Sequence, residues 1–211
     1  MPPIESLATF LIASALLSIA PGPDNIFVLT QAALQGKHAG ILVTLGLCTG
    51  LLLHTAAVAL GVAAILQTSP LAFTFLKFAG GIYLLFLAWQ AFRASAHRLE
   101  TPGSTLSSKG ALYRRGIIMN TTNPKVSIFF LAFLPQFAAP EHGPLMPQIF
   151  LLGALFICVA LVVFNALALV AAELGRWLNN SPRAQLYLQR TAGALYTALA
   201  LKLISASAHA E

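Results

Sequence analysis

Long apolar stretches dominate the chain, and polar residues are confined mainly to short segments between them. A helix needs roughly 20 predominantly apolar residues to cross the hydrocarbon core of a bilayer. The pattern predicts an all-α integral membrane protein with six transmembrane helices. To within about 2–4 residues, the predicted spans run from Ile4 to Leu34, Gly40 to Leu66, Pro70 to Phe92, Gly116 to Phe137, Pro147 to Leu174 and Leu188 to Ser205.

Two of these spans contain a polar interruption. In the first span it is Ser-Ile-Ala-Pro-Gly-Pro-Asp-Asn at 18–25, and in the fourth it is Asn-Thr-Thr-Asn-Pro-Lys at 120–125. Proline removes a backbone donor and glycine weakens a helix, so both spans are predicted to be broken helices. Such breaks survive in a membrane only where they are buried in protein or line a cavity, and paired breaks indicate a transporter binding site. The predicted helix-breaking residues are Pro21, Gly22, Pro23 and Pro124.

The composition agrees with a membrane protein. Hydrophobic residues make up 58% of the chain and charged residues only 9%, whereas soluble domains average about 25% charged residues. The first apolar run lacks the basic leader of a cleavable signal peptide, so it is predicted to remain as the first span. The formal charge of +6 would suit nucleic acid, but the placement of the basic residues argues against that partner.

The basic residues gather on one side of the predicted membrane. If the spans alternate in direction, nine of the twelve Lys and Arg residues fall after the first, third and fifth spans. The opposite connections, 67–69 and 138–146, contain none. The positive-inside rule places the basic side in the cytoplasm. The polar segment 93–115 is therefore predicted to be a cytoplasmic linker, and both chain ends are predicted to face outward.

Three spans lie on each side of this linker. Because three is odd, a duplicated half inserts with the opposite orientation. Pro23 corresponds to Pro124, and Ala-Gly-Gly-Ile-Tyr-Leu at 79–84 corresponds to Ala-Gly-Ala-Leu-Tyr-Thr at 192–197. The predicted organisation is therefore two inverted three-helix repeats, at 1–92 and 116–211, joined by the linker at 93–115.

Asp24 is the only acidic residue well inside a predicted span. A charge at the bilayer centre costs at least about 2.5–3.5 kcal/mol on insertion scales, so such a residue faces the protein interior and is a functional candidate. Asp24 can cap the helix that starts after Pro23, or it can bind a proton or a substrate ammonium group. The two roles are compatible.

Polar residues at the second break complement Asp24. Asn25, Asn120 and Asn123 each offer hydrogen-bond donors and acceptors. Free amides at the start of a half-helix, together with Lys125, can hold a carboxylate. With an ammonium group at Asp24, the two breaks suit a zwitterionic amino acid. The alternative for Lys125 is a side chain that snorkels to the lipid headgroups.

For further polar residues inside the spans, both a structural and a functional role are left open. His54 is either a hydrogen-bonded packing residue or a proton relay. Asn165, likewise a lone polar residue in the middle of a span, is also left open between packing and function. Lys77 either snorkels or acts in transport. Cys48 and Cys158 stand singly in apolar runs, and no metal-ligand spacing, activated nucleophile or phosphate loop is visible. The sequence therefore predicts no metal, no cofactor and no enzymatic activity, and an ion gradient as the energy source.

Motifs from three predicted spans stand together in this chain: Pro21-Gly22-Pro23-Asp24, then Lys77 with Gly80 and Tyr83-Leu84, and then Asn120, Asn123-Pro124-Lys125 and Phe133-Leu134-Pro135-Gln136-Phe137. Together these motifs resemble the LysE/RhtB family of bacterial amino-acid exporters. The resemblance implies export of an amino acid such as homoserine, threonine, leucine or lysine across the inner membrane, by proton antiport with alternating access. It implies a multi-pass inner-membrane protein in contact with lipid, and it leaves a homo-oligomer open. In an inner membrane, the chain ends that the basic residues predict to face outward would be periplasmic.

Two other functions are kept as alternatives. Export of an inorganic cation, as in distant members of this superfamily, needs several convergent carboxylates, whereas Asp24 stands alone. A thiol redox relay through Cys48 and Cys158 lacks a second cysteine beside either residue in the sequence.

Overall fold

The computed structural model describes residues 2–62, 70–94 and 108–205. All regular elements in this part of the chain are helices. They are α1 (Ile4–Ile19), α2 (Pro23–Gln35), α3 (Lys37–Ala57) continued by the π-helical η1 (Val58–Val62), α5 (Pro70–Arg93), α6 (Lys109–Thr121), α7 (Pro124–Ile128), η2 (Phe129–Phe133), η3 (Leu134–Phe137), η4 (Pro140–His142), α8 (Leu145–Asn180) and α9 (Pro182–Ser205). The predicted end of the second span at Leu66, most of the predicted linker and the last six residues lie outside the described residues.

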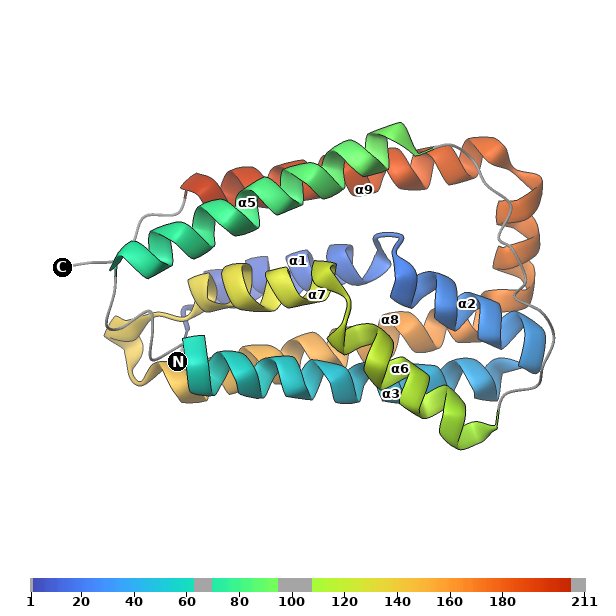
Figure 1. The fold of residues 1–211 in the computed structure, drawn as a ribbon, viewed down its shortest axis with the longest axis horizontal. Helices are drawn as coiled ribbons and strands as arrows, with labels where there is room; N and C mark the ends of the chain where they lie inside the picture. Colours follow the sequence, from blue (N-terminus) through green and yellow to red (C-terminus); the bar gives the residue numbers. More distant parts are fainter. Residues whose placement is uncertain (1, 63–69, 95–107, 206–211) are drawn as a thin grey trace.

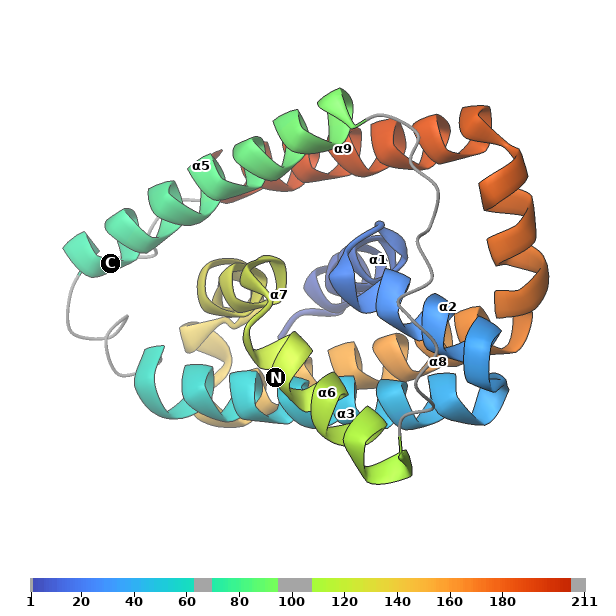
Figure 2. The same ribbon diagram turned by 45° about the vertical axis from the view of Figure 1, so that its right-hand side comes forward.

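The helices form three layers (Figure 1). α3 and α8 pack together on one side, and α5 and α9 pack together on the other. Between them lie α1 and α7, which run side by side and are seen nearly end-on in Figure 2. The breaks between α1 and α2 and between α6 and α7 therefore fall in the middle of the protein.

The first break follows from local backbone chemistry. Pro21 has no N–H and its ring clashes with the carbonyl four residues earlier, so α1 cannot continue through it. Ala20 precedes a proline and is extended, at φ −55° and ψ 125°. Pro23 then occupies the first turn of α2, where a missing N–H does no harm. The axes of α1 and α2 differ by 55°, so the predicted break in the first span is confirmed.

The second break has the same cause. Asn123 precedes Pro124 and is extended, at φ −76° and ψ 107°, which ends α6 and places Pro124 at the start of α7. The two parts differ in direction by 51°, as predicted for the fourth span. However, α6 begins at Lys109, whereas the predicted start was Gly116. Ser108 accepts a hydrogen bond from Ala111 N and caps the helix there, so α6 includes Arg114 and Arg115, which the hydropathy pattern had assigned to the linker.

Three described helices, at Lys37–Gly61, Thr74–Arg93 and Leu145–Ala171, are long and apolar enough to cross a membrane. The number rises to five if each bent pair counts as one span. α9 is not among these candidates, because polar residues such as Arg183, Gln185, Gln189 and Arg190 occupy its first half. The sixth predicted span is thus a helix of sufficient length, but its composition does not identify it as a span.

Small residues let neighbouring helices approach closely. A Cβ added at Gly46 of α3 would lie 2.2 Å from Tyr113 O of α6, and one at Gly116 would lie 2.5 Å from Val43 O. On the other side, Gly81 of α5 lies against Ile204 of α9. These contacts allow backbone-to-backbone packing that larger side chains would prevent.

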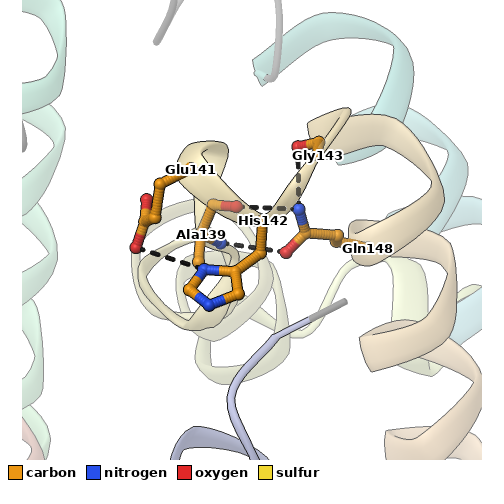
Figure 3. A network of polar contacts seen from close by, with 5 residues as sticks. All are labelled: Ala139, Glu141, His142, Gly143 and Gln148. Atoms are coloured by element: carbon orange, nitrogen blue, oxygen red, sulfur yellow. Dashed lines mark hydrogen bonds and ion pairs between the residues drawn. The ribbon is translucent and has the colours of Figure 1, made fainter.

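A buried glutamine fixes the connection between η3 and α8 (Figure 3). Gln148 accepts a hydrogen bond from Ala139 N at 2.9 Å and donates to Ala139 O and Gly143 O, each at 2.9 Å. Glu141 and His142 remain exposed on the same connection, with an Oε1–Nδ1 distance of 3.6 Å. This one side chain therefore replaces the backbone hydrogen bonds that the irregular segment lacks.

Candidate functional site

The two breaks face each other, and Asp24 joins them. Asn120, at the end of α6, donates from Nδ2 to Asp24 Oδ2 at 3.0 Å. Asn123, just before α7, donates from Nδ2 to Asp24 Oδ1 at 2.9 Å. Asp24, Asn120 and Asn123 are only 2%, 1% and 3% exposed. One buried carboxylate is therefore clamped by two amides that lie about 100 residues away in the sequence.

The carbonyl end of α1 is bound by two other buried side chains. Asn25 donates from Nδ2 to Ser18 O at 2.7 Å. The Lys125 ammonium donates to Ala20 O at 3.1 Å and to Leu17 O at 3.4 Å. Leu17 O is the carbonyl whose helical partner would have been the N–H of residue 21, which proline lacks. These side chains satisfy carbonyls that the first break leaves without a partner.

Asn123 has a second role as the cap of α7. Its Oδ1 accepts a hydrogen bond from Lys125 N at 3.0 Å, while its Nδ2 donates to Asp24. Because both ends of this amide are engaged, its orientation is fixed by the fold. Asn120 is less constrained, since its Oδ1 is buried without a hydrogen-bond partner.

The charges are placed at favourable helix ends. Asp24 lies in the first turn of α2, where unpaired N–H groups favour a negative charge. The Lys125 ammonium lies at the last turn of α1, where unpaired carbonyls favour a positive charge. Each charge is therefore stabilised by a half-helix end and by neutral polar groups, as expected for charged side chains kept away from lipid.

Three buried oxygen atoms around the breaks have no hydrogen-bond partner: Ser18 Oγ, Asn25 Oδ1 and Asn120 Oδ1. A buried polar atom without a partner costs about 1–3 kcal/mol. All three atoms can accept a hydrogen bond. Together with Asp24 they give the break region a surplus of acceptors, which suits a ligand that carries N–H groups.

Glycines make this arrangement possible. A Cβ at Gly22 would lie 2.9 Å from Lys125 Nζ, and a Cβ at Gly50 of α3 would lie 2.6 Å from Asn120 Oδ1. Any side chain at Gly22 would therefore crowd the ammonium, and one at Gly50 would crowd the amide that holds Asp24.

The structure decides between several roles that the sequence left open. Gly22 is the residue that precedes α2, and no side-chain hydrogen bond caps that helix. The expectation that Asp24 caps α2 is therefore wrong, because its oxygens accept from Asn120 and Asn123 instead. The alternative that Lys125 snorkels to lipid headgroups is also wrong, because this side chain is 7% exposed and bonded inside the protein.

His54 lies next to the break. Its Nε2 is 3.2 Å from Asn120 O, and its ring packs 5.7 Å from that of Phe130. These contacts are those of a hydrogen-bonded packing residue, which was one of the two roles considered, and they also place the imidazole beside the Asp24 clamp.

The remaining candidates lie on other helices. Asn165 is on α8, where its Oδ1 is buried without a hydrogen-bond partner. Lys77 is half-buried on α5, with its ammonium 5.0 Å from the centre of the Phe78 ring. The contacts described above unite Asp24, Asn25, Asn120, Asn123, Lys125 and His54, but they do not include Asn165 or Lys77.

Sequence reasoning missed the part played by Leu17, Ser18 and Ala20, whose carbonyls bind the Lys125 and Asn25 side chains. The signal was present for Leu17, because a proline four residues later always removes the N–H that would bind that carbonyl. Within the described ranges, no three His, Cys, Asp or Glu side chains gather in a group that could hold a metal ion.

One family model and several individual proteins match nearly the whole of this chain. The model of the LysE type translocator family matches residues 15–207. The homoserine/homoserine lactone efflux protein of Salmonella typhimurium is 35% identical over 93% of this chain and 95% of its own length. An uncharacterized membrane protein of Vibrio cholerae is 30% identical over 94% of this chain and 96% of its own. The leucine efflux protein of Salmonella choleraesuis is 26% identical, with 92% of each chain covered. No solved structure matches the chain.

Proposed function

Since the chain belongs to the LysE type translocator family, a family of transporters rather than enzymes, we propose that it exports small amino acids, with L-homoserine as the first candidate. The observation that carries this proposal is the buried Asp24 carboxylate, held by Asn120 and Asn123 where two broken helices meet. A buried carboxylate suits an ammonium group, and the unpartnered acceptor atoms on residues that flank the two breaks add to this.

Chemistry favours the ammonium group as the feature that is recognised. The relative from Salmonella typhimurium is named for both homoserine and homoserine lactone. These two compounds share an ammonium group, but the lactone has no free carboxylate. In this chain the atoms without partners around the breaks are likewise acceptors. The proposed order of binding is therefore ammonium first, at Asp24 and Asn25, with the substrate carboxylate or its ester near Lys125.

We further propose that the fold is two inverted three-helix repeats that cross the membrane six times and move against each other in alternating access. Several observations support this. Pro23 and Pro124 each start the second part of a broken helix, with similar bends of 55° and 51°. The junctions α2–α3 and α8–α9, the end of α5 and the start of α6 lie at one end of the molecule (Figure 1). That end carries Lys37, Arg93, Lys109 and Arg183.

On this proposal the basic end is cytoplasmic, the chain ends are periplasmic, and the protein lies in a bacterial inner membrane in contact with lipid. Protons are the proposed coupling ion, taken up at Asp24 when the substrate leaves. The proposal also includes roles for Lys77 and Asn165 in the transport pathway and the assembly of a homo-oligomer.

The function is tested by transport into liposomes that contain the purified full-length protein. Liposomes preloaded with unlabelled L-homoserine should accumulate labelled L-homoserine from outside, whereas protein-free liposomes should not. L-Homoserine lactone, L-threonine, L-leucine and L-lysine inside the liposomes then give the order of substrates. Exchange with none of these compounds would contradict the assignment, and exchange of a divalent metal ion instead would favour the cation-export alternative.

A further inference from the structure

We propose that the carbonyl end of α1 is an ammonium-binding site which Lys125 occupies in the resting protein, and which the substrate ammonium takes over by displacing Lys125. This inference rests on the proposed function, because it adds the carbonyls of α1 to Asp24 and Asn25 as acceptors for the same substrate ammonium group. It changes the role of Lys125 from a fixed carboxylate-binding residue to an internal occupant that substrate must replace.

The first support is the way in which Lys125 is bound. Its ammonium reaches across to another helix and donates to Ala20 O at 3.1 Å and Leu17 O at 3.4 Å. A primary ammonium on a substrate can donate to the same two carbonyls. In a buried position, such charge-assisted hydrogen bonds are roughly twice as strong as neutral ones. The site therefore already holds the chemical group that an amino acid would bring.

The second support is independent of Lys125. Asn25 donates to Ser18 O at the same end of α1, and the Oδ1 of that amide has no partner, although Asn25 is 4% exposed. Ser18 Oγ is also buried without a partner. These two oxygens are additional to the two carbonyls that Lys125 uses. A ligand with further N–H groups could therefore form hydrogen bonds that the resting protein does not form.

The third support is the space at Gly22. A Cβ there would lie 2.9 Å from Lys125 Nζ and 3.4 Å from its Cε. The missing side chain leaves room for an ammonium group. When a substrate ammonium occupies this room, Lys125 must leave the carbonyls, and its positive charge is then available for the substrate carboxylate.

The test measures methylammonium binding to the purified full-length protein by isothermal titration, at constant ionic strength. In Lys125→Met the apolar side chain vacates the carbonyls, so methylammonium should bind at least about tenfold more tightly than to the wild type, the effect of one charge-assisted hydrogen bond. Tetramethylammonium, which has the same charge but no N–H group, should show no gain. Lys37→Met, at an exposed lysine, should behave as the wild type.

Two glycine variants sharpen the result. Gly22→Ala added to Lys125→Met places a methyl group in the vacated room and should abolish the gain. Gly110→Ala, where nothing lies within 4 Å of the added Cβ, should leave it intact. Equal methylammonium binding by wild type and Lys125→Met, or a gain for sodium ions without one for methylammonium, would overturn the inference.

Chemical rescue keeps the test decisive if Lys125→Met fails to fold. Methylammonium in the purification buffer should then restore folded, monodisperse protein, because a ligand that binds only the folded state stabilises it. Tetramethylammonium should not restore it, and the absence of rescue by methylammonium would also overturn the inference. Neither readout depends on transport, so loss of homoserine exchange in the wild type would count against the proposed function and not against this site.

Discussion

The substitution Asp24→Asn removes the charge of the clamp and keeps its shape. In the wild type, both carboxylate oxygens accept hydrogen bonds, from Asn120 Nδ2 at 3.0 Å and from Asn123 Nδ2 at 2.9 Å. The new amide has one oxygen and one NH₂ group. One of these two contacts would therefore bring two hydrogen-bond donors together, unless the side-chain amide of Asn120 or Asn123 flips.

The structure indicates which neighbour can turn. Asn123 is held in one orientation because its Oδ1 accepts from Lys125 N. Asn120 Oδ1 has no partner, so a 180° flip of this amide exchanges one unpartnered atom for another. The flipped Asn120 then accepts from the new amide, and both contacts survive. Asp24→Asn should therefore fold, whereas Asp24→Ala leaves two buried amides without acceptors, at a cost of about 1–3 kcal/mol each.

The cost to binding should be much larger than the cost to stability. A hydrogen bond to a charged group contributes about 1.5–3 kcal/mol, so its loss weakens the binding of an ammonium group by roughly 10- to 150-fold. The assay has two arms: exchange of labelled for unlabelled L-homoserine, and uptake driven by an imposed pH gradient, both in liposomes. Thermal unfolding in detergent controls for folding.

The two arms separate the roles proposed for Asp24. Loss of both arms in a folded Asp24→Asn protein is expected if the carboxylate binds the substrate ammonium. Loss of gradient-driven uptake alone would make Asp24 a proton carrier only. Wild-type rates in both arms would refute the reasoning and remove Asp24 from the mechanism.

Three other substitutions test the surroundings of the clamp. Gly116→Ala should lower the free energy of unfolding by about 1–3 kcal/mol, because its Cβ would lie 2.5 Å from Val43 O; thermal unfolding that matches Gly110→Ala would contradict this close crossing. Asn123→Ala should lose the contact to Asp24 and also the cap of α7, and loss of the cap alone should lower the free energy of unfolding by about 1 kcal/mol. Asn123→Ser should recover only the cap, so equal unfolding temperatures for these two variants would count against the capping role. His54→Phe should lower the free energy of unfolding by less than about 1.5 kcal/mol, the contribution of one hydrogen bond, and should retain gradient-driven homoserine uptake. A folded variant without uptake would favour the proton relay.

The sequence predicted the features that depend on local chemistry. Both broken helices could be found from Pro21, Pro23 and Pro124, because a missing N–H interrupts a helix wherever the chain folds. The burial of Asp24 was also predictable, because hydrocarbon excludes a charge that the protein does not surround. Helix limits beyond the apolar stretches were harder to predict: α6 begins at Lys109 because Ser108 caps it, and hydropathy carries no information on a cap.

Only the tertiary structure decided which groups meet. Asn120 and Asn123 reach Asp24, and Lys125 reaches the carbonyls of α1, because α6 and α7 cross the first broken helix at its break. Sequence reasoning proposed a carboxylate-binding lysine or a snorkelling one, and neither prediction included the bonds from Lys125 to the carbonyls of α1. A residue type states what a side chain can bind, but its partner is chosen by the distances between helices that are far apart in the chain, and those distances are set by packing at positions such as Gly22 and Gly50.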